Sequence, residues 1–288
     1  MKKMTILFPG SYMNYRDIDE DMKGEYRSVL NTGLFDIILF NYDEWLAGGK
    51  LRLKRSGDSS KKTIYRGWML KPDDYGKLYQ VLQDYDIELI TSPREYENLH
   101  LFPNVYPHIK NDTAGLIEFK DREVDINAVK KQFAKFMVKD SVKSVKGTEF
   151  PAFFDQSISQ EEFDQWMEVF YKYRGDLLTG GICIKEYLEL KRYGDKTNEV
   201  RVFYANHQIL SVSRNTLQSD YTEMPPEGLI GKYAELDSPY YTIDYAELSD
   251  GSWKIIEAGD GEVSGLSPGQ DMEAYFRALY HSFMDTKK

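Results

Sequence analysis

Three acidic residues in the second half of the chain are the clearest candidates for chemistry. Asp244 and Glu257 flank an Asp250-Gly251 dipeptide, and Asp260 follows shortly after Glu257. Because Asp-Gly between alternating runs rich in Tyr, Ile and Trp is typical of a two-residue hairpin turn, the segment predicts two antiparallel strands. Counting outwards from the turn places Asp244 directly opposite Glu257, at the end of the apolar face of the hairpin.

Two carboxylates in that position repel each other, and burial adds a desolvation cost. A divalent cation between them removes both penalties, and Mg²⁺ takes carboxylate oxygens and commonly bridges to substrate phosphates. Asp260 lies in a glycine-rich loop whose backbone can turn tightly enough to supply a third ligand. We therefore expect a Mg²⁺ site, the alternative being an acidic, solvated hairpin tip. The same register pairs Glu247 with Lys254 on the face turned towards water.

A second hairpin brings arginine and glutamate together. Its turn is Asn206-His207, and the same counting places Glu199 opposite Arg214, with Arg201 on the same face. Guanidinium groups oriented by a carboxylate present paired donors that suit phosphate oxygens. A structural ion-pair network on the surface would leave the same pattern, so this hairpin alone does not separate binding from structure.

One lysine ends an apolar strand. Lys139 closes the apolar part of KFMVKDSV, and a polar loop with two further lysines, suited to covering phosphates, follows at residues 140–147. The loop lacks the GxxxxGK[ST] pattern, and a lysine at a strand end commonly faces solvent instead. The four histidines show no metal-ligand spacing, and we expect the single Cys183 to be a buried thiol rather than a nucleophile.

Composition restricts the possible classes of protein. With 288 residues the chain can bury a real core, in one large domain or two modest ones. The net charge of −10 argues against general nucleic-acid binding, and no apolar run approaches the length of a membrane span. Because the start of the chain lacks the pattern of a signal peptide, we expect a cytoplasmic protein.

The first part of the chain predicts a small α/β domain. Apolar runs at residues 4–8 and 35–40, separated by a helix-compatible stretch, predict a β-α-β unit, and a helix from Pro72 precedes a further strand. We expect the basic, serine-containing residues 50–62 to form an exposed loop. Residues 103–115 are rich in Pro, Asn, Asp and Thr, which is typical of a boundary between domains.

We therefore expect domains at residues 1–115 and 116–288. In the second domain, the strand ending in Lys139 and its loop come first. A helix capped by Ser159 and the strand GICIKEYLEL follow, and then the two hairpins and a final helix.

This order of parts resembles the ATP-grasp superfamily over residues 116–288. In the first domain, YRGWML at residues 65–70 resembles the preceding domain of a bacterial and phage clade named for two arginines and a lysine. The resemblance implies an α+β fold in which two α+β lobes sandwich ATP, preceded by a small α/β domain.

The resemblance also implies roles for particular residues. Five would contact ATP: Lys139 on its phosphates, Lys185, Glu186 and Leu188 at the adenine hinge, and Glu189 at the ribose. Asp244, Glu257 and Asp260 would bind Mg²⁺. Arg201 and Arg214 would face the transferring phosphate or the acceptor carboxylate. The sequence departs from the family pattern in two places, because SVKSVKG replaces the glycine-rich phosphate loop and Glu257-Ala-Gly-Asp260 replaces the closing E-x-N.

Members of the superfamily typically phosphorylate a carboxylate and let an amine or similar nucleophile attack the acylphosphate. We therefore expect an ATP- and Mg²⁺-dependent ligase that forms an amide or peptide-type bond between small-molecule or peptide carboxylate and amine substrates. The alternatives are an ATP-grasp kinase that stops at a phosphorylated product and a nucleotide-binding regulator without turnover. Arg66 and Arg94 are either substrate contacts or ordinary structural arginines.

Overall fold

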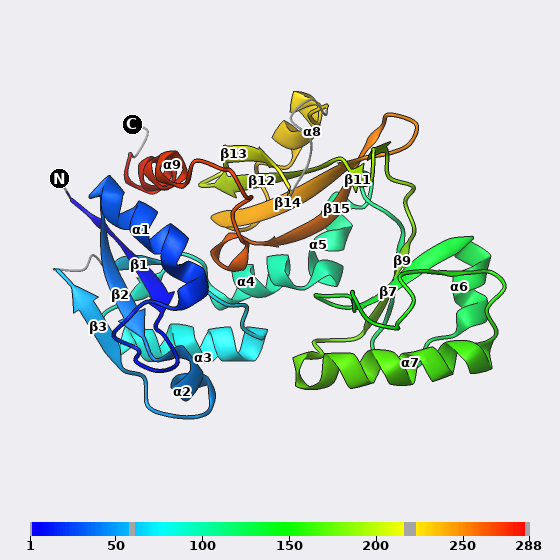
Figure 1. Ribbon diagram of the computed structural model, residues 1–288, viewed down its shortest axis with the longest axis horizontal. Coiled ribbons are helices and arrows are strands. Elements are labelled where there is room, and N and C mark those ends of the chain that lie inside the picture. The colour runs from blue at the N-terminus through cyan, green and yellow to red at the C-terminus, as the bar shows by residue number, and fades with distance from the viewer. Residues whose placement is uncertain (1, 58–60, 216–222, 286–288) are drawn as a thin grey trace.

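The computed structural model describes residues 2–57, 61–215 and 223–285. Figure 1 shows the N-terminal α/β domain, a small lobe containing β7, β9 and α7, and a larger sheet that carries β12–β15. None of the helices among the described residues has the length and apolar character that crossing a bilayer requires.

The N-terminal domain is built on a five-stranded sheet of order β3-β2-β1-β4-β5. Strands β1 and β2 are parallel and are joined by α1, so the predicted β-α-β unit is confirmed. The loop expected at residues 50–62, of which 58–60 lie outside the described residues, is wrong in part, because β3 pairs there with β2 in the antiparallel sense. The elements are β1 (Met4–Pro9), α1 (Lys23–Thr32), β2 (Phe35–Phe40), α2 (Tyr42–Leu46), β3 (Leu53–Ser56), β4 (Lys62–Tyr65), α3 (Pro72–Gln83) and β5 (Glu88–Leu89).

A helix, α5 (Phe102–Ile109), occupies the first half of the region at residues 103–115 expected to be an irregular boundary, and another helix, α4 (Pro93–His100), precedes it. Phe102, Val105 and Ile109 of α5 are buried together, so an apolar helical face exists in spite of the prolines. Pro103 lies in the first turn, where a missing backbone N–H is tolerated.

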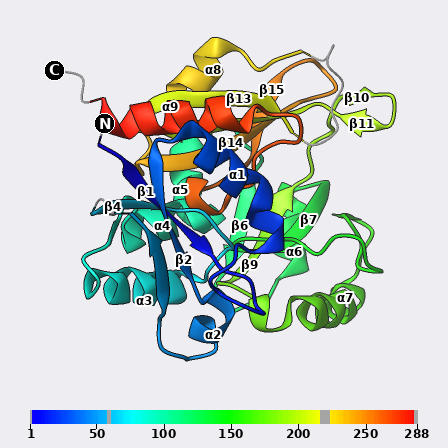
Figure 2. The ribbon, with the colours of Figure 1, turned by 60° about the vertical axis from the view of Figure 1, so that its left-hand side comes forward.

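The small lobe contains a four-stranded sheet of order β6-β9-β7-β8. Helices α6 and α7 cover one of its faces, and their apolar residues form one core with Phe136, Val138 and Ile184 of the strands (Figure 2). The opposite face carries Lys139 and Lys185. The elements are β6 (Leu116–Phe119), α6 (Ile126–Gln132), β7 (Lys135–Asp140), β8 (Phe154–Asp155), α7 (Gln160–Arg174) and β9 (Ile182–Glu186).

The larger sheet has the order β13-β12-β14-β15. One face packs on α5 and α8, and one end of the other face packs on α9 and the N-terminal domain. The short hairpin β10–β11 connects the small lobe to this sheet. The elements are β10 (Arg192–Tyr193), β11 (Lys196–Thr197), β12 (Glu199–Ala205), β13 (Gln208–Arg214), α8 (Glu227–Lys232), β14 (Tyr240–Glu247), β15 (Trp253–Asp260) and α9 (Met272–Met284).

Candidate active site

The predicted carboxylate pair lies on neighbouring strands of the larger sheet. Asp244 on β14 is directly opposite Glu257 on β15. The turn itself differs from the prediction, because Leu248 N donates to Ser252 O and three residues rather than two close the hairpin. A β-bulge next to Asp244 then restores the register, so the pairing of the two acids holds although the residues nearer the turn are displaced by one.

That displacement removes the expected pair between Glu247 and Lys254. Glu247 instead lies opposite Trp253 and is buried. Its carboxylate accepts hydrogen bonds from Lys191, Tyr193 and Asn198, which fasten the β10–β11 hairpin to the sheet. The prediction that Glu247 faces water is therefore wrong.

Arg201 joins the carboxylate pair from the neighbouring strand β12. It lies opposite Asp244, and its Nε and Nη2 each donate to one oxygen of that carboxylate at 2.8 Å. Its Nη1 donates to Gly265 O at 2.9 Å. Arg201, Asp244 and Glu257 thus form a row across three adjacent strands.

Arg214 and Glu199 do not join this row. A bulge between Phe203 and Tyr204 shifts the hairpin, so Arg214 lies opposite Val200 instead of Glu199. Glu199 accepts a hydrogen bond from the Thr197 hydroxyl at 2.6 Å. The predicted pairing of Glu199 with Arg214 is wrong, because the count from the turn contained no bulge.

Two buried lysines approach Glu257 from the small lobe. Lys139 Nζ is 3.5 Å from Glu257 Oε1, and Lys185 Nζ donates to Ile256 O. Both ammonium groups also lie over the ring of Phe102, at 4.8 Å and 4.3 Å from its centroid. Cation–π contacts with the Phe102 ring therefore hold the two lysines beside each other.

The electrostatics of this cluster are dominated by positive charge. Burial, and then the proximity of Lys139, lower the pKa of Lys185 to about 7. Burial alone would raise the pKa of Glu257, but four surrounding lysines outweigh it and lower that pKa to about 2: Lys139, Lys143, Lys185 and Lys146. Glu257 is therefore ionised at neutral pH, as a metal ligand must be.

Asp260 lines the same cavity as Asp244 and Glu257, but its side chain lies on the other side of β15. Alternate residues of a strand point to opposite faces, so Asp260 points away from the face that carries Glu257. One of its oxygens accepts from Glu262 N at 2.8 Å, and the other is buried without a hydrogen-bond partner among the described residues. Within the described part of the chain, no group of three Asp, Glu, His or Cys side chains is arranged to hold a metal ion.

The predicted adenine hinge connects the small lobe to the larger sheet. Glu186 accepts a hydrogen bond from Gly115 N at 3.0 Å through its side chain. Glu189 O accepts from Ser249 N at 2.9 Å, at the turn of the β14–β15 hairpin. Leu188 is half-buried between them. The segment is therefore attached at both ends, and the carboxylate of Glu186 already has a backbone partner.

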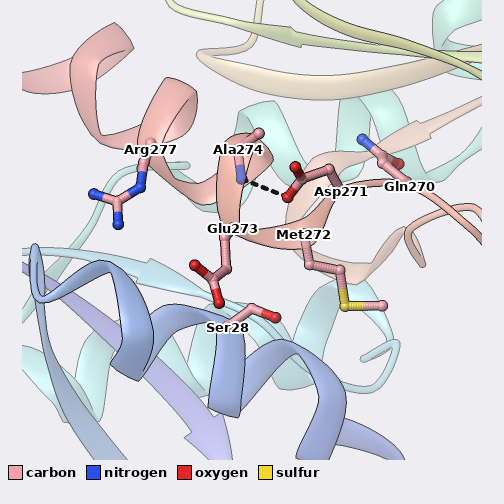
Figure 3. A pocket seen from close by; sticks show the side chains of 7 residues that line it. All are labelled: Ser28, Gln270, Asp271, Met272, Glu273, Ala274 and Arg277. Atoms are coloured by element: carbon pink, nitrogen blue, oxygen red, sulfur yellow. Dashed lines mark hydrogen bonds between the residues drawn. The ribbon is translucent and has the colours of Figure 1, made fainter.

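A cavity of about 170 Å³ lies over the row of charged residues and is lined by Lys143, Arg201, Asp244 and Glu257 among others. His100, which the sequence did not single out, lines it as well; burial, and then the charge of Lys143, lower the pKa of His100 to about 4. A larger hollow of about 580 Å³ between α1 and α9 contains none of the predicted site residues (Figure 3).

The two arginines of the first domain have structural partners. Arg66 is buried, forms an ion pair with Glu25 at 2.6 Å, and donates to the carbonyls of Gly261 and Ser264 in the segment after β15. Arg94 forms an exposed pair with Asp237 at 2.8 Å. Arg66 therefore binds the N-terminal domain to the loop beside the cavity, whereas Arg94 lies on the surface.

Comparison with solved structures identifies the fold. The chain superposes on the ATP-grasp ligase PsnB complexed with a minimal precursor, with a TM-score of 0.59 and 11% identity over 98% of this chain and 100% of that one. It also matches the D-alanine-D-alanine ligase from Coxiella burnetii, with a TM-score of 0.62 and 10% identity over 98% and 94% of the two chains. The protein therefore has the ATP-grasp fold.

Sequence comparison then defines the family. The model of the ATP-grasp domain of R2K clade family 3 matches residues 126–279, just over half of the chain, so the chain belongs to this family. None of the curated proteins compared with the chain matches it.

Proposed function

We propose that this protein is an ATP- and Mg²⁺-dependent ligase that joins a carboxylate to an amine through an acylphosphate. The observation that supports it most directly is the meeting of Lys139 and Lys185 from one lobe with Arg201, Asp244 and Glu257 from the other. Lysines suit the phosphates of ATP, and the arginine is placed to stabilise charge that develops on a transferring phosphoryl group.

Asp244 and Glu257 fit a magnesium ion. They supply oxygen atoms from directly opposite positions, and Glu257 is ionised at neutral pH. Arg201 holds both oxygens of Asp244 in a fixed plane, which orients that carboxylate. When bound, Mg²⁺ would neutralise phosphate charge. We propose these two residues as its protein ligands, and Asp260 only as a residue that shapes the loop beside them.

Lys139 is proposed to contact the phosphates, with Lys185 beside it. Because Lys185 is 5% exposed and touches Ile256 O, it also holds the small lobe to β15. Glu186, Leu188 and Glu189 remain the proposed hinge at the adenine and ribose. Solved structures of PsnB with Mg and ADP share this fold with a TM-score of 0.56, which supports the choice of nucleotide and ion.

The substrates are proposed by class only. The matched structures include a ligase complexed with a minimal precursor, a D-alanine-D-alanine ligase and a macrocyclase bound with a precursor peptide. We therefore expect an amino-acid or peptide carboxylate. A panel of such carboxylates should be tested for ADP formation with Mg²⁺-ATP and hydroxylamine, which traps an acylphosphate as a hydroxamate that mass spectrometry detects.

The expected result is a carboxylate-dependent hydroxamate. A phosphate ester without hydroxamate would identify a kinase instead. Nucleotide binding with no turnover on any member of the panel would favour a regulator. Glu257→Gln serves as the inactive control, because it removes a proposed metal ligand without removing the hydrogen-bonding shape of the side chain.

A further inference from the structure

We propose that Asp140, locked in place by Arg174, is a positioning residue that holds Lys143 against the outer phosphates of the nucleotide. The inference rests on the proposed function, since it concerns the same cavity. It addresses the loop at residues 141–147, where the sequence lacks the glycine-rich pattern of the family.

Asp140 organises this loop with a single buried carboxylate. It is 0% exposed, and its Oδ1 accepts from the backbone N–H groups of Val142 and Lys143, each at 2.7 Å. Its Oδ2 accepts from Arg174 Nε at 2.9 Å and from Thr179 N at 3.1 Å. Four donors on one carboxylate fix the first turn of the loop without glycine.

The loop is also attached by its backbone and its apolar side chains. Ser141 N donates to Thr179 O, and Ser141 O accepts from Phe102 N at the start of α5. In the repeated Ser-Val-Lys pattern, Val142 and Val145 are both buried. The valines therefore anchor the loop to the protein, and the intervening Lys143 is left at the cavity.

The charge around Lys143 indicates that an anion binds there. Lys143 lines the cavity, and although its backbone N–H donates to Asp140, its ammonium group forms no hydrogen bond or ion pair with the described residues. The charge of Lys143 acts on Glu257, but that carboxylate already faces Lys139 at 3.5 Å, and Asp244 is paired with Arg201. In a chain with a net charge of −10, this local excess of cations fits phosphate oxygens.

Calorimetric titration with Mg²⁺ and the non-hydrolysable analogue adenylyl imidodiphosphate tests the proposal. Lys143→Ala and Arg174→Ala should each weaken binding about 10-fold, the scale of one charge-assisted hydrogen bond. AMP, which lacks the outer phosphates, should bind both variants with nearly wild-type affinity. Arg174→Lys should restore part of the loss, because it keeps one donor to Asp140.

The double variant separates positioning from independent binding. If Arg174 acts through Lys143, combining Lys143→Ala with Arg174→Ala should weaken binding of the analogue by no more than about 10-fold. Independent effects would multiply to a loss of about 100-fold and would overturn the proposal. Lys130→Ala is the control, because it removes a lysine that donates to Ile158 O elsewhere in the same lobe. An Arg174→Ala protein that melts earlier but binds the analogue normally would show a purely structural role. A wild-type protein that does not bind the analogue would overturn the proposed function together with this inference.

Discussion

Arg201 and Arg214 are the residues for which the structure changes the expected roles most. Only Arg201 reaches Asp244 and the cavity. Arg201→Ala should therefore lower kcat by about 10² to 10³, and lysine should not restore it, because a single ammonium cannot reproduce the two-pronged contact. Arg214→Ala is the matched comparison and should retain more activity. Equal losses in the two variants would restore the original prediction for Arg214.

The metal site makes a separate comparison possible between Glu257 and Asp260. Glu257→Gln should abolish the dependence of nucleotide affinity on Mg²⁺, measured by titration at several Mg²⁺ concentrations, whereas Asp260→Asn should preserve it. The reason is that Glu257 faces Asp244 while Asp260 points to the other side of the sheet. A loss of the Mg²⁺ dependence in Asp260→Asn would show that Asp260 is a ligand after all.

Asp260 should instead affect stability through pH. Burial raises its pKa to about 8, and burial, followed by the charge of Asp260, raises the pKa of neighbouring Glu262. The folded state thus holds protons that the unfolded state releases, so this contribution to stability is present at acid pH and is lost as pH rises from about 4 through 8.

Asp260→Asn should flatten that dependence. The melting temperature of Asp260→Asn minus that of wild type should therefore increase steadily between pH 5 and 8. Exposed Asp121→Asn is the control and should follow wild type. A constant difference between wild type and Asp260→Asn across this pH range would contradict the assignment.

At the scale of the element, the two hairpins show what a register count from sequence can achieve. The β12–β13 turn forms at Asn206-His207 as predicted, whereas the β14–β15 turn has three residues instead of two. Each hairpin also contains a bulge that the sequence pattern does not reveal. In β14–β15 the bulge compensates for a longer turn, so Asp244 still meets Glu257. In β12–β13 nothing compensates, and Arg214 moves to the wrong partner.

The helices followed local signals more closely than the loops did. Pro72 begins α3 and Ser159 caps α7 as expected, because these signals act within one turn. Asp140, Phe102 and His100 were missed as site residues because their positions depend on contacts between segments distant in sequence. The alternation of valine with lysine in SVKSVKG is the one local feature of the sequence that indicates an anchored loop.

The turn of β12–β13 supplies a prediction about the element itself. Asn206 and His207 both have positive φ, 48° and 60°, which a β-carbon disfavours. His207→Gly should therefore stabilise the protein by about 0.5 to 1 kcal/mol in denaturant unfolding. The adjacent Gln208→Gly, within β13, should destabilise it, so a loss of stability in both variants would contradict the conformational explanation.

At the scale of the whole molecule, Arg66 joins the N-terminal domain to the segment after β15. Removing one partner of a buried ion pair costs about 3 to 5 kcal/mol, so Arg66→Ala should lower the free energy of unfolding by that amount. Arg94→Ala breaks an exposed pair and should change it by about 0 to 1 kcal/mol. Similar small losses in both variants would show that Arg66 does not hold the two regions together.

The proposed boundary near residue 115 separates elements that nonetheless share a core. Phe35 of β2 packs against Phe276 and Tyr280 of α9, and the Tyr280 hydroxyl donates to Lys2 O. Residues 1–115 alone would therefore leave Phe35 and its neighbours on the central strands uncovered.

That contact between residues near 2 and near 280 has a consequence for biosynthesis. During translation, β1 and β2 leave the ribosome long before α9. Their apolar surface therefore stays exposed until α9, which is synthesised more than two hundred residues later, can pack against it. Contacts of such sequence separation close slowly, and exposed strands favour aggregation in the interval. Recovery of folded protein should therefore depend on synthesis rate and chaperone supply, and the domain made first should be the one that acquires its native protection from hydrogen exchange last.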